Sequence, residues 1–127
     1  MTKRKILVVD DEASLTRMLK LNLEETGKYE VRTENHGAGT MNTALEFRPD
    51  LILLDIMMPD MPGSDVAEEI LKNRELKDTK IIFLTALVSK QEAEVADGKI
   101  AGRSFVAKPA GIEELVQAIE KEFEGKY

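Results

Sequence analysis

The sequence predicts an α/β fold of the doubly wound class, a five-stranded parallel sheet in the order 2-1-3-4-5 with helices on both faces. Three observations support this prediction. Short, strongly apolar runs alternate along the 127 residues with segments of helical periodicity. Right-handed crossovers between parallel strands place the intervening helices on both faces of the sheet. One run alternates apolar and polar residues instead, which is typical of an edge strand.

Five segments have the composition of strands. Four of them are nearly continuous apolar runs, which is typical of strands buried on both faces. The remaining run, which is the second in the chain, alternates apolar and polar residues, and we therefore place it at the edge of the sheet. The expected strands cover residues 5–9, 29–33, 51–55, 81–84 and 104–107.

The segments between and after these runs are expected to be helical. The last helix is the clearest, because apolar residues recur from Ile112 at i+3, i+4, i+7 and i+11. Gly27 is a natural stop for the first helix, and residues 37–47 predict a weaker second one. Ser64 is a candidate N-cap for the third helix, and the Ser89-Lys90-Gln91-Glu92 sequence matches a capping box at the start of the fourth.

Composition limits the class of protein. At this length the chain is expected to form one domain, residues 1–127. It has no cysteine, which excludes disulfides, thiolate zinc sites and cysteine nucleophiles. No apolar run approaches the roughly 18 residues of a membrane span, and a net charge of −6 argues against a nucleic-acid surface. We therefore expect a cytoplasmic protein without membrane contact or direct nucleic-acid binding.

Polar residues follow four of the expected strands where each strand ends: Asp10-Asp11, Asp55, Thr85 and Lys108. Because the carboxyl ends of parallel strands share one edge of a sheet, these side chains should converge. Three carboxylates at close range repel one another, and a hard cation with oxygen ligands, above all Mg²⁺, would relieve the repulsion. An ionised carboxylate such as Asp55 can also form an aspartyl phosphate. Thr85 and Lys108 would then stabilise the phosphoryl group.

Four short motifs therefore occur together at one edge of the expected sheet. They are Asp10-Asp11, Asp55 with Met58-Pro59 and Gly63 after it, Thr85-Ala86, and Lys108-Pro109. In this combination the chain resembles the receiver domains of bacterial two-component response regulators, the CheY-like family. The resemblance covers essentially the whole chain, and its strand order is the flavodoxin-like order expected from the pattern of strands and helices.

The resemblance implies a phosphoacceptor and a metal site. Asp55 would accept a phosphoryl group from a sensor histidine kinase or a histidine phosphotransfer protein. Asp10 and Asp11 would bind Mg²⁺, together with Asp55 and the backbone carbonyl of Met57. The chain would not be a conventional enzyme, but a phosphoacceptor that promotes its own phosphorylation and dephosphorylation.

The resemblance also implies a switch. Thr85 and Lys108 would contact the phosphoryl group, with a cis peptide between Lys108 and Pro109, and Phe105 would be the aromatic switch residue. The surface of the fourth helix, fifth strand and fifth helix would then change its affinity for a downstream protein, and a dimer that depends on phosphorylation is compatible with this scheme. Residues 97–105 depart from the usual family pattern, so that surface is the least defined part of the resemblance.

Two other functions stay open at this point. A receiver-like interaction module would use the same fold without phosphorylation. An aspartyl-phosphate phosphatase would use the same nucleophile, but it would be expected to carry a second acid two residues later, where this chain has Met57. Taken singly, Asp10, Asp11 or Asp55 could cap a turn, and Phe105 could be a static residue of the core.

Overall fold

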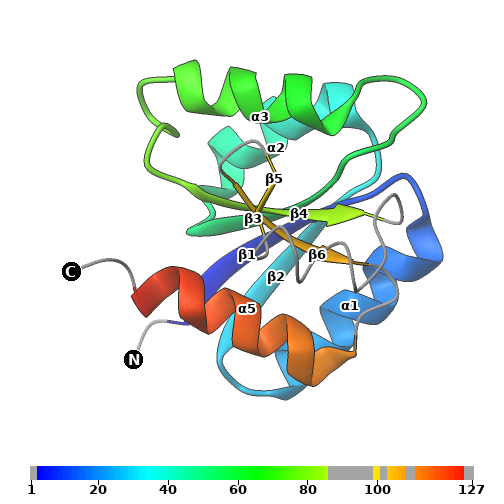
Figure 1. Ribbon diagram of the computed structural model, residues 1–127, viewed down its shortest axis with the longest axis vertical. Coiled ribbons are helices and arrows are strands. Elements are labelled where there is room, and N and C mark those ends of the chain that lie inside the picture. The colour runs from blue at the N-terminus through cyan, green and yellow to red at the C-terminus, as the bar shows by residue number, and fades with distance from the viewer. Residues whose placement is uncertain (1–2, 86–98, 101–102, 108–110, 125–127) are drawn as a thin grey trace.

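The computed structural model describes residues 3–85, 99–100, 103–107 and 111–124, which form one sheet between two layers of helices (Figure 1). The strands are β1 (Arg4–Val9), β2 (Tyr29–Glu34), β3 (Leu51–Asp55), β4 (Lys80–Thr85), β5 (Lys99–Ile100) and β6 (Arg103–Ala107). The helices within these residues are α1 (Ala13–Glu25), the 3-10 helix η1 (Gly37–Gly39), α2 (Thr40–Phe47), α3 (Gly63–Lys72) and α5 (Ile112–Glu124). None of these helices has both the length and the apolar character that a membrane crossing requires.

Five strands pair in parallel in the order β2-β1-β3-β4-β6, which confirms the predicted order. The alternating strand β2 lies at one edge, as its pattern predicted. The described residues contain one further strand that the sequence did not predict. This strand, β5, is two residues long and pairs antiparallel with the start of β6. Two residues carry no recognisable periodicity, so the prediction of a purely parallel five-stranded sheet was incomplete at this edge.

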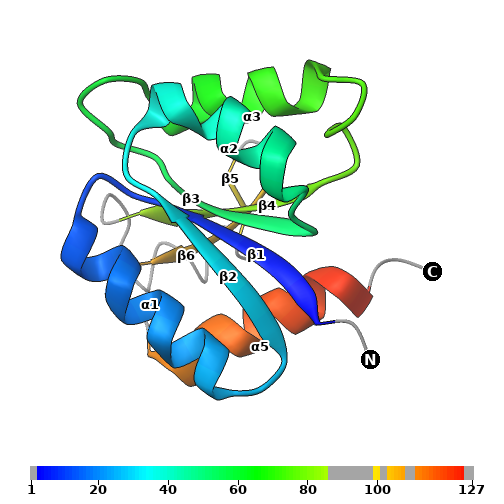
Figure 2. The same cartoon turned by 180° about the vertical axis from the view of Figure 1, so that it is seen from behind.

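The central strands separate two apolar cores. In β1, Leu7 and Val9 pack into the core beneath α2 and α3, whereas Ile6 and Val8 pack into the core beneath α1 and α5. All four side chains are fully buried. Figures 1 and 2 show the two helix pairs on opposite faces of the sheet. Complete burial of one such side chain contributes about 1.5–3 kcal/mol, which explains why an apolar run predicts these strands so well.

The helix boundaries agree with the sequence in two places and differ in one. Gly27 follows the end of α1 with a φ of 79°, and the helix predicted over residues 37–47 forms as η1 followed by α2. The prediction that Ser64 caps α3 was wrong. The N-cap is Pro62, whose backbone is extended (φ −61°, ψ 144°) and directly precedes the first helical residue, Gly63. The helix predicted to begin at Ser89 lies outside the described residues.

Candidate functional site

The register of the sheet brings Asp10 and Asp55 side by side. Strands β1 and β3 run parallel, with Val9 opposite Leu54. Asp10 directly follows β1 and Asp55 is the last residue of β3, so the two acids occupy equivalent positions at the carboxyl ends of neighbouring strands. Both are buried, with exposed fractions of 1% and 4%. The apolar pairing of the two strands is therefore what places two carboxylates together.

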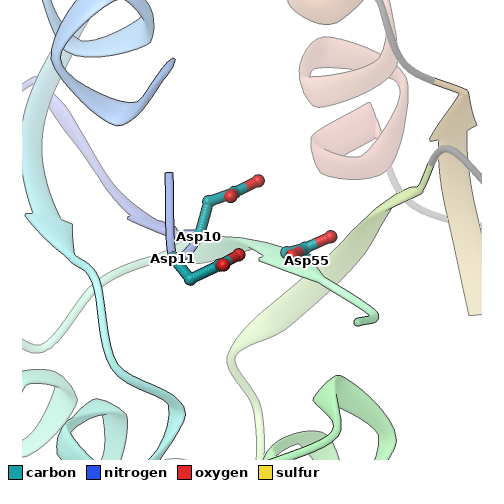
Figure 3. Close-up of side chains that lie close together, drawn as sticks. All are labelled: Asp10, Asp11 and Asp55. Atoms are coloured by element: carbon teal, nitrogen blue, oxygen red, sulfur yellow. The ribbon is translucent and has the colours of Figure 1, made fainter. Parts of the chain in front are cut away.

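Asp11 completes the group, which we call the acid cluster (Asp10, Asp11 and Asp55). One carboxylate oxygen from each residue lies within 4.8 Å of the other two. Figure 3 shows the three side chains pointing beyond the ends of the strands into the same region. Asp11 is exposed, unlike its two neighbours, so the cluster has one side open to solvent.

The acid cluster has the donor set of a hard-cation site. At 4.8 Å and an effective dielectric constant of about 20, two ionised carboxylates repel each other by about 3–4 kcal/mol. Three carboxylates, two of them buried, are therefore unfavourable unless positive charge lies nearby. Oxygen atoms are the ligands that Mg²⁺ and Ca²⁺ accept, and Mg²⁺ commonly binds one or two carboxylates and keeps several waters. The residues present thus fit a divalent cation.

The backbone of Asp10 is held by the end of β2 and by the residue that follows it. The N–H of Asp10 donates to the carbonyl oxygen of Glu34 at 3.1 Å. The Asn35 side-chain amide donates to the carbonyl oxygen of Asp10 at 2.8 Å and to the Thr16 hydroxyl at 3.0 Å. The Asp10 carboxylate itself accepts the N–H of Glu12 at 3.0 Å. Sequence reasoning missed Asn35, because a lone asparagine after a strand carries no periodic signal.

On the other side of the site, the loop between β3 and α3 closes tightly on the end of β3. The N–H of Gly63 donates to the carbonyl oxygen of Ile56 at 2.7 Å. A Cβ atom on Gly63 would lie 2.2 Å from the backbone oxygen of Asp55, so glycine alone fits at this position. Met58 is buried in the core beneath α2 and α3, whereas the Met57 side chain is 64% exposed. The backbone that carries Met57 is therefore anchored before and after it.

The remaining predicted residues belong to β4, to β6 and to the segment that follows β6 in the sequence. Thr85 ends β4, next to β3, so its backbone lies at the same edge as Asp55. Phe105 lies in β6 and is buried in the core beneath α2 and α3. The Thr85 side chain and both residues of Lys108-Pro109 fall outside what the structure describes. The structure thus brings together Asp10, Asp11 and Asp55.

Comparison with known proteins identifies relatives at the level of sequence. A family model for the response regulator receiver domain matches residues 6–120. Transcriptional regulatory protein ResD of Bacillus subtilis (strain 168) is 40% identical over 117 residues, which cover 91% of this chain and 46% of ResD. Probable transcriptional regulator ycf27 of Guillardia theta is 39% identical over 118 residues, covering 90% of this chain and 43% of ycf27. The chain spans less than half the length of these two relatives.

Solved structures show the same architecture. Chemotaxis protein CheY4 of Vibrio cholerae superposes with a TM-score of 0.80 at 29% sequence identity, covering 94% of this chain and 98% of that one. A putative response regulator of Chloroflexus aurantiacus J-10-fl superposes with a TM-score of 0.82 at 26% identity, covering 98% of this chain and 100% of that one. The likeness therefore extends over nearly the entire fold.

Proposed function

The chain belongs to the response regulator receiver domains of two-component systems, and from this premise we propose that Asp55 accepts a phosphoryl group from a histidine kinase or a histidine phosphotransfer protein. The observation that carries this proposal is the register of β1 and β3, which sets Asp55 beside Asp10 and Asp11. A buried carboxylate that lies beside two other carboxylates is suited to chemistry that depends on its charge, such as cation binding or attack on a phosphoryl group.

In the proposed reaction, an oxygen of the Asp55 carboxylate attacks the phosphorus of a phosphohistidine. An O–P bond forms as the P–N bond breaks, and the electron pair returns to the imidazole nitrogen of the donor. An ionised carboxylate carries no proton to be removed, so its attack needs no general base. Such a transfer depends mainly on positioning and on neutralising negative charge.

We assign the ligands of a Mg²⁺ ion to Asp10, Asp11, Asp55 and the backbone carbonyl of Met57. When bound, the ion would offset the charge of the carboxylates and of the phosphoryl oxygens. The chain's own contribution is to hold these oxygens in place before the ion arrives. The hydrogen bonds to the Asp10 backbone and the close fit of Gly63 against Asp55 support this assignment.

We also assign Thr85 and Lys108 to the phosphoryl group and Phe105 to the switch. A phosphoryl group adds nearly two negative charges and three acceptor oxygens, which would draw the Thr85 hydroxyl and the Lys108 ammonium toward Asp55. Phe105 lies on β6, whose Ala107 pairs with Thr85. A change at Thr85 would therefore reach Phe105 through directly paired strands.

The proposed setting is the cytoplasm, which suits a chain without cysteine. The partners would be a kinase or phosphotransfer protein and a downstream protein. ResD and ycf27 are named as transcriptional regulators and are about twice as long as this chain, so DNA binding by a longer protein containing it is compatible with the proposal. This chain's own role would be the control of such an output.

The test is phosphorylation by acetyl phosphate and Mg²⁺, followed by intact mass measurement. We expect the wild type to gain one phosphoryl group, and Asp55→Asn to gain none. Removing Mg²⁺ with a chelator should also abolish the gain. Asp78→Asn, which neutralises an exposed aspartate elsewhere, serves as the matched control and should react like the wild type. A wild type that stays unmodified would favour the phosphorylation-independent interaction module, and steady release of phosphate from small phosphoesters would favour a phosphatase.

A further inference from the structure

We propose that residues 34–38, here called the bridging segment, fix the loop after β3, and with it the backbone carbonyl of Met57, relative to Asp10, with Asn35 and Asp60 as positioning residues. This inference rests on the proposed function, because it concerns the same Mg²⁺ ligands. One half of the site follows β1 and carries Asp10 and Asp11. The other half comprises Asp55 and the loop after it. The bridging segment runs from the last residue of β2 into η1, supplies none of the proposed ligands, and contacts both halves.

The first contact is with the residues after β1. The carbonyl oxygen of Glu34 accepts the N–H of Asp10 at 3.1 Å. The side-chain amide of Asn35 donates one hydrogen bond to the carbonyl oxygen of Asp10 at 2.8 Å and another to the hydroxyl of Thr16 at 3.0 Å. Both backbone polar groups of Asp10 are therefore bound by consecutive residues of the bridging segment. Asn35 also joins this loop to α1 through Thr16.

The second contact is with the loop after β3. The two carboxylate oxygens of Asp60 accept the N–H groups of Gly37 at 3.1 Å and of Ala38 at 2.9 Å. These N–H groups lie in the first turn of η1, where backbone donors have no partner within the helix. A Cβ atom on Gly37 would lie 2.9 Å from the Cβ of Met61, so the segment and the loop also touch directly. The hydrogen bond from the Ala38 N–H is the largest cause of a lowered pKa of Asp60, and the hydrogen bond from Gly37 acts in the same direction.

Asp60 connects the bridging segment to the loop that carries Met57, which is a proposed Mg²⁺ ligand. The loop after β3 is closed at its base by the hydrogen bond from Gly63 to Ile56. Asp60 ties the tip of the same loop to the bridging segment. Met57 lies between these two points, so its backbone carbonyl is held relative to Asp10 through a continuous set of hydrogen bonds. Loss of either Asn35 or Asp60 would remove part of this set and leave the loop after β3 less firmly positioned relative to Asp10.

The experiment measures Mg²⁺ affinity directly by titration calorimetry with Mg²⁺ alone, and stability by urea denaturation. The variants are Asp60→Ala, Asp60→Asn, Asn35→Ala and the double variant Asp60→Ala/Asn35→Ala. Asp78→Ala is the matched control, because it removes an exposed carboxylate far from these contacts in the sequence. Amide resonances of Gly37 and Ala38 report whether their hydrogen bonds to Asp60 are broken.

We expect Asp60→Ala and Asn35→Ala each to weaken Mg²⁺ binding about three- to tenfold, the effect of losing hydrogen bonds of ordinary net strength. Asp60→Asn should lose less, because its one carbonyl oxygen still accepts one N–H. The double variant should lose less than the product of the two single losses, because both residues act through the same segment. Asp78→Ala should bind Mg²⁺ like the wild type.

The outcomes separate this inference from the proposed function. If the variants lose stability while their folded forms bind Mg²⁺ with unchanged affinity, the bridging segment is merely structural and the inference is wrong. If the wild type binds no Mg²⁺, both the proposed function and this inference are wrong. Should Asp60→Ala not fold, Asp60→Asn and Asn35→Ala decide the matter by the same measurement.

Discussion

The amino and carboxyl ends of the sheet differ in the charged groups that they bring together. At the carboxyl end, the three like charges of the acid cluster lie within 4.8 Å of one another. At the amino end, polar and charged side chains lie next to favourable partners. The Tyr29 hydroxyl donates to the Glu120 carboxylate, and the Arg4 guanidinium lies 3.9 Å from the centroid of the Phe123 ring. The sheet therefore ends in favourable contacts on one side and in mutually repelling carboxylates on the other.

This difference shows where stability and function are located. Contacts of the amino end, such as a ring beneath a guanidinium, each contribute on the order of 1 kcal/mol to the folded state. The carboxylates of the acid cluster repel one another, and a bound cation would relieve this repulsion. A change at the amino end should therefore alter stability alone, whereas a change at the carboxyl end should alter cation binding as well.

The largest expected effect is that of Gly63→Ala at the carboxyl end. Its Cβ would lie 2.2 Å from the backbone oxygen of Asp55, so the end of β3 or the following loop must move. We expect a loss of about 3 kcal/mol in the free energy of unfolding, measured by urea denaturation, and a more than tenfold loss in Mg²⁺ affinity. Gly111→Ala is the control, because a Cβ there meets nothing within 4 Å. Equal behaviour of the two variants would contradict the close fit described for Gly63.

Tyr29→Phe tests the amino end and should have an intermediate effect. The variant removes the hydroxyl that donates to Glu120 and leaves the half-buried carboxylate without that donor. We expect a loss of about 1–2 kcal/mol in the free energy of unfolding, with the Mg²⁺ dissociation constant unchanged. The double variant Tyr29→Phe/Glu120→Gln should recover part of the loss. A change in Mg²⁺ affinity would contradict the expectation that the amino end of the sheet affects stability alone.

The same tyrosine predicts a pH dependence. Burial, and then the hydrogen bond to Glu120, raise the pKa of Tyr29 above its ordinary value of 10.0. The unfolded chain therefore ionises first, so the contribution of Tyr29 is complete below about pH 10 and declines as the pH rises toward the pKa of the folded state. The stability advantage of the wild type over Tyr29→Phe should shrink above pH 10, by at most about 1.4 kcal/mol per pH unit. A pH-independent difference in urea denaturation would argue against this burial.

Glu24→Gln should have the smallest effect, because its ion pair belongs to neither end. The Glu24 carboxylate lies 3.0 Å from the Lys20 ammonium and accepts the N–H of Val31 at 3.1 Å. The hydrogen bond from Lys20 is the largest cause of a lowered pKa of Glu24. The stabilisation is thus present above about pH 4.5 and lost as the pH falls through the lower pKa of the folded state. We expect under about 1 kcal/mol by urea denaturation at pH 7, because the pair is partly exposed, and a loss above 2 kcal/mol would contradict this.

How much of the structure the sequence predicts depends on how far apart in the sequence the contacting residues lie. The apolar runs of β1 and β3 predict strands because each side chain enters one of two cores, and the parallel pairing that follows is enough to bring Asp10 beside Asp55. The contacts of Asn35 and Asp60 join loops that are distant in sequence. No periodicity marks such contacts, since they depend on the folded geometry of both loops. The wrong cap at Ser64 has a different origin, because local preferences locate a helix start only to within one or two residues.

The strand order also has a consequence for the order of events in folding. The acid cluster needs only β2, β1 and β3, which are neighbours in the sheet and consecutive in the chain. All of its residues are therefore synthesised before β4, β6 and α5. Because a domain generally folds as a unit, the three carboxylates come together in the same step that pairs β1 with β3. The repulsion among the three carboxylates then opposes that folding step, and a cation bound at the site would reduce this opposition.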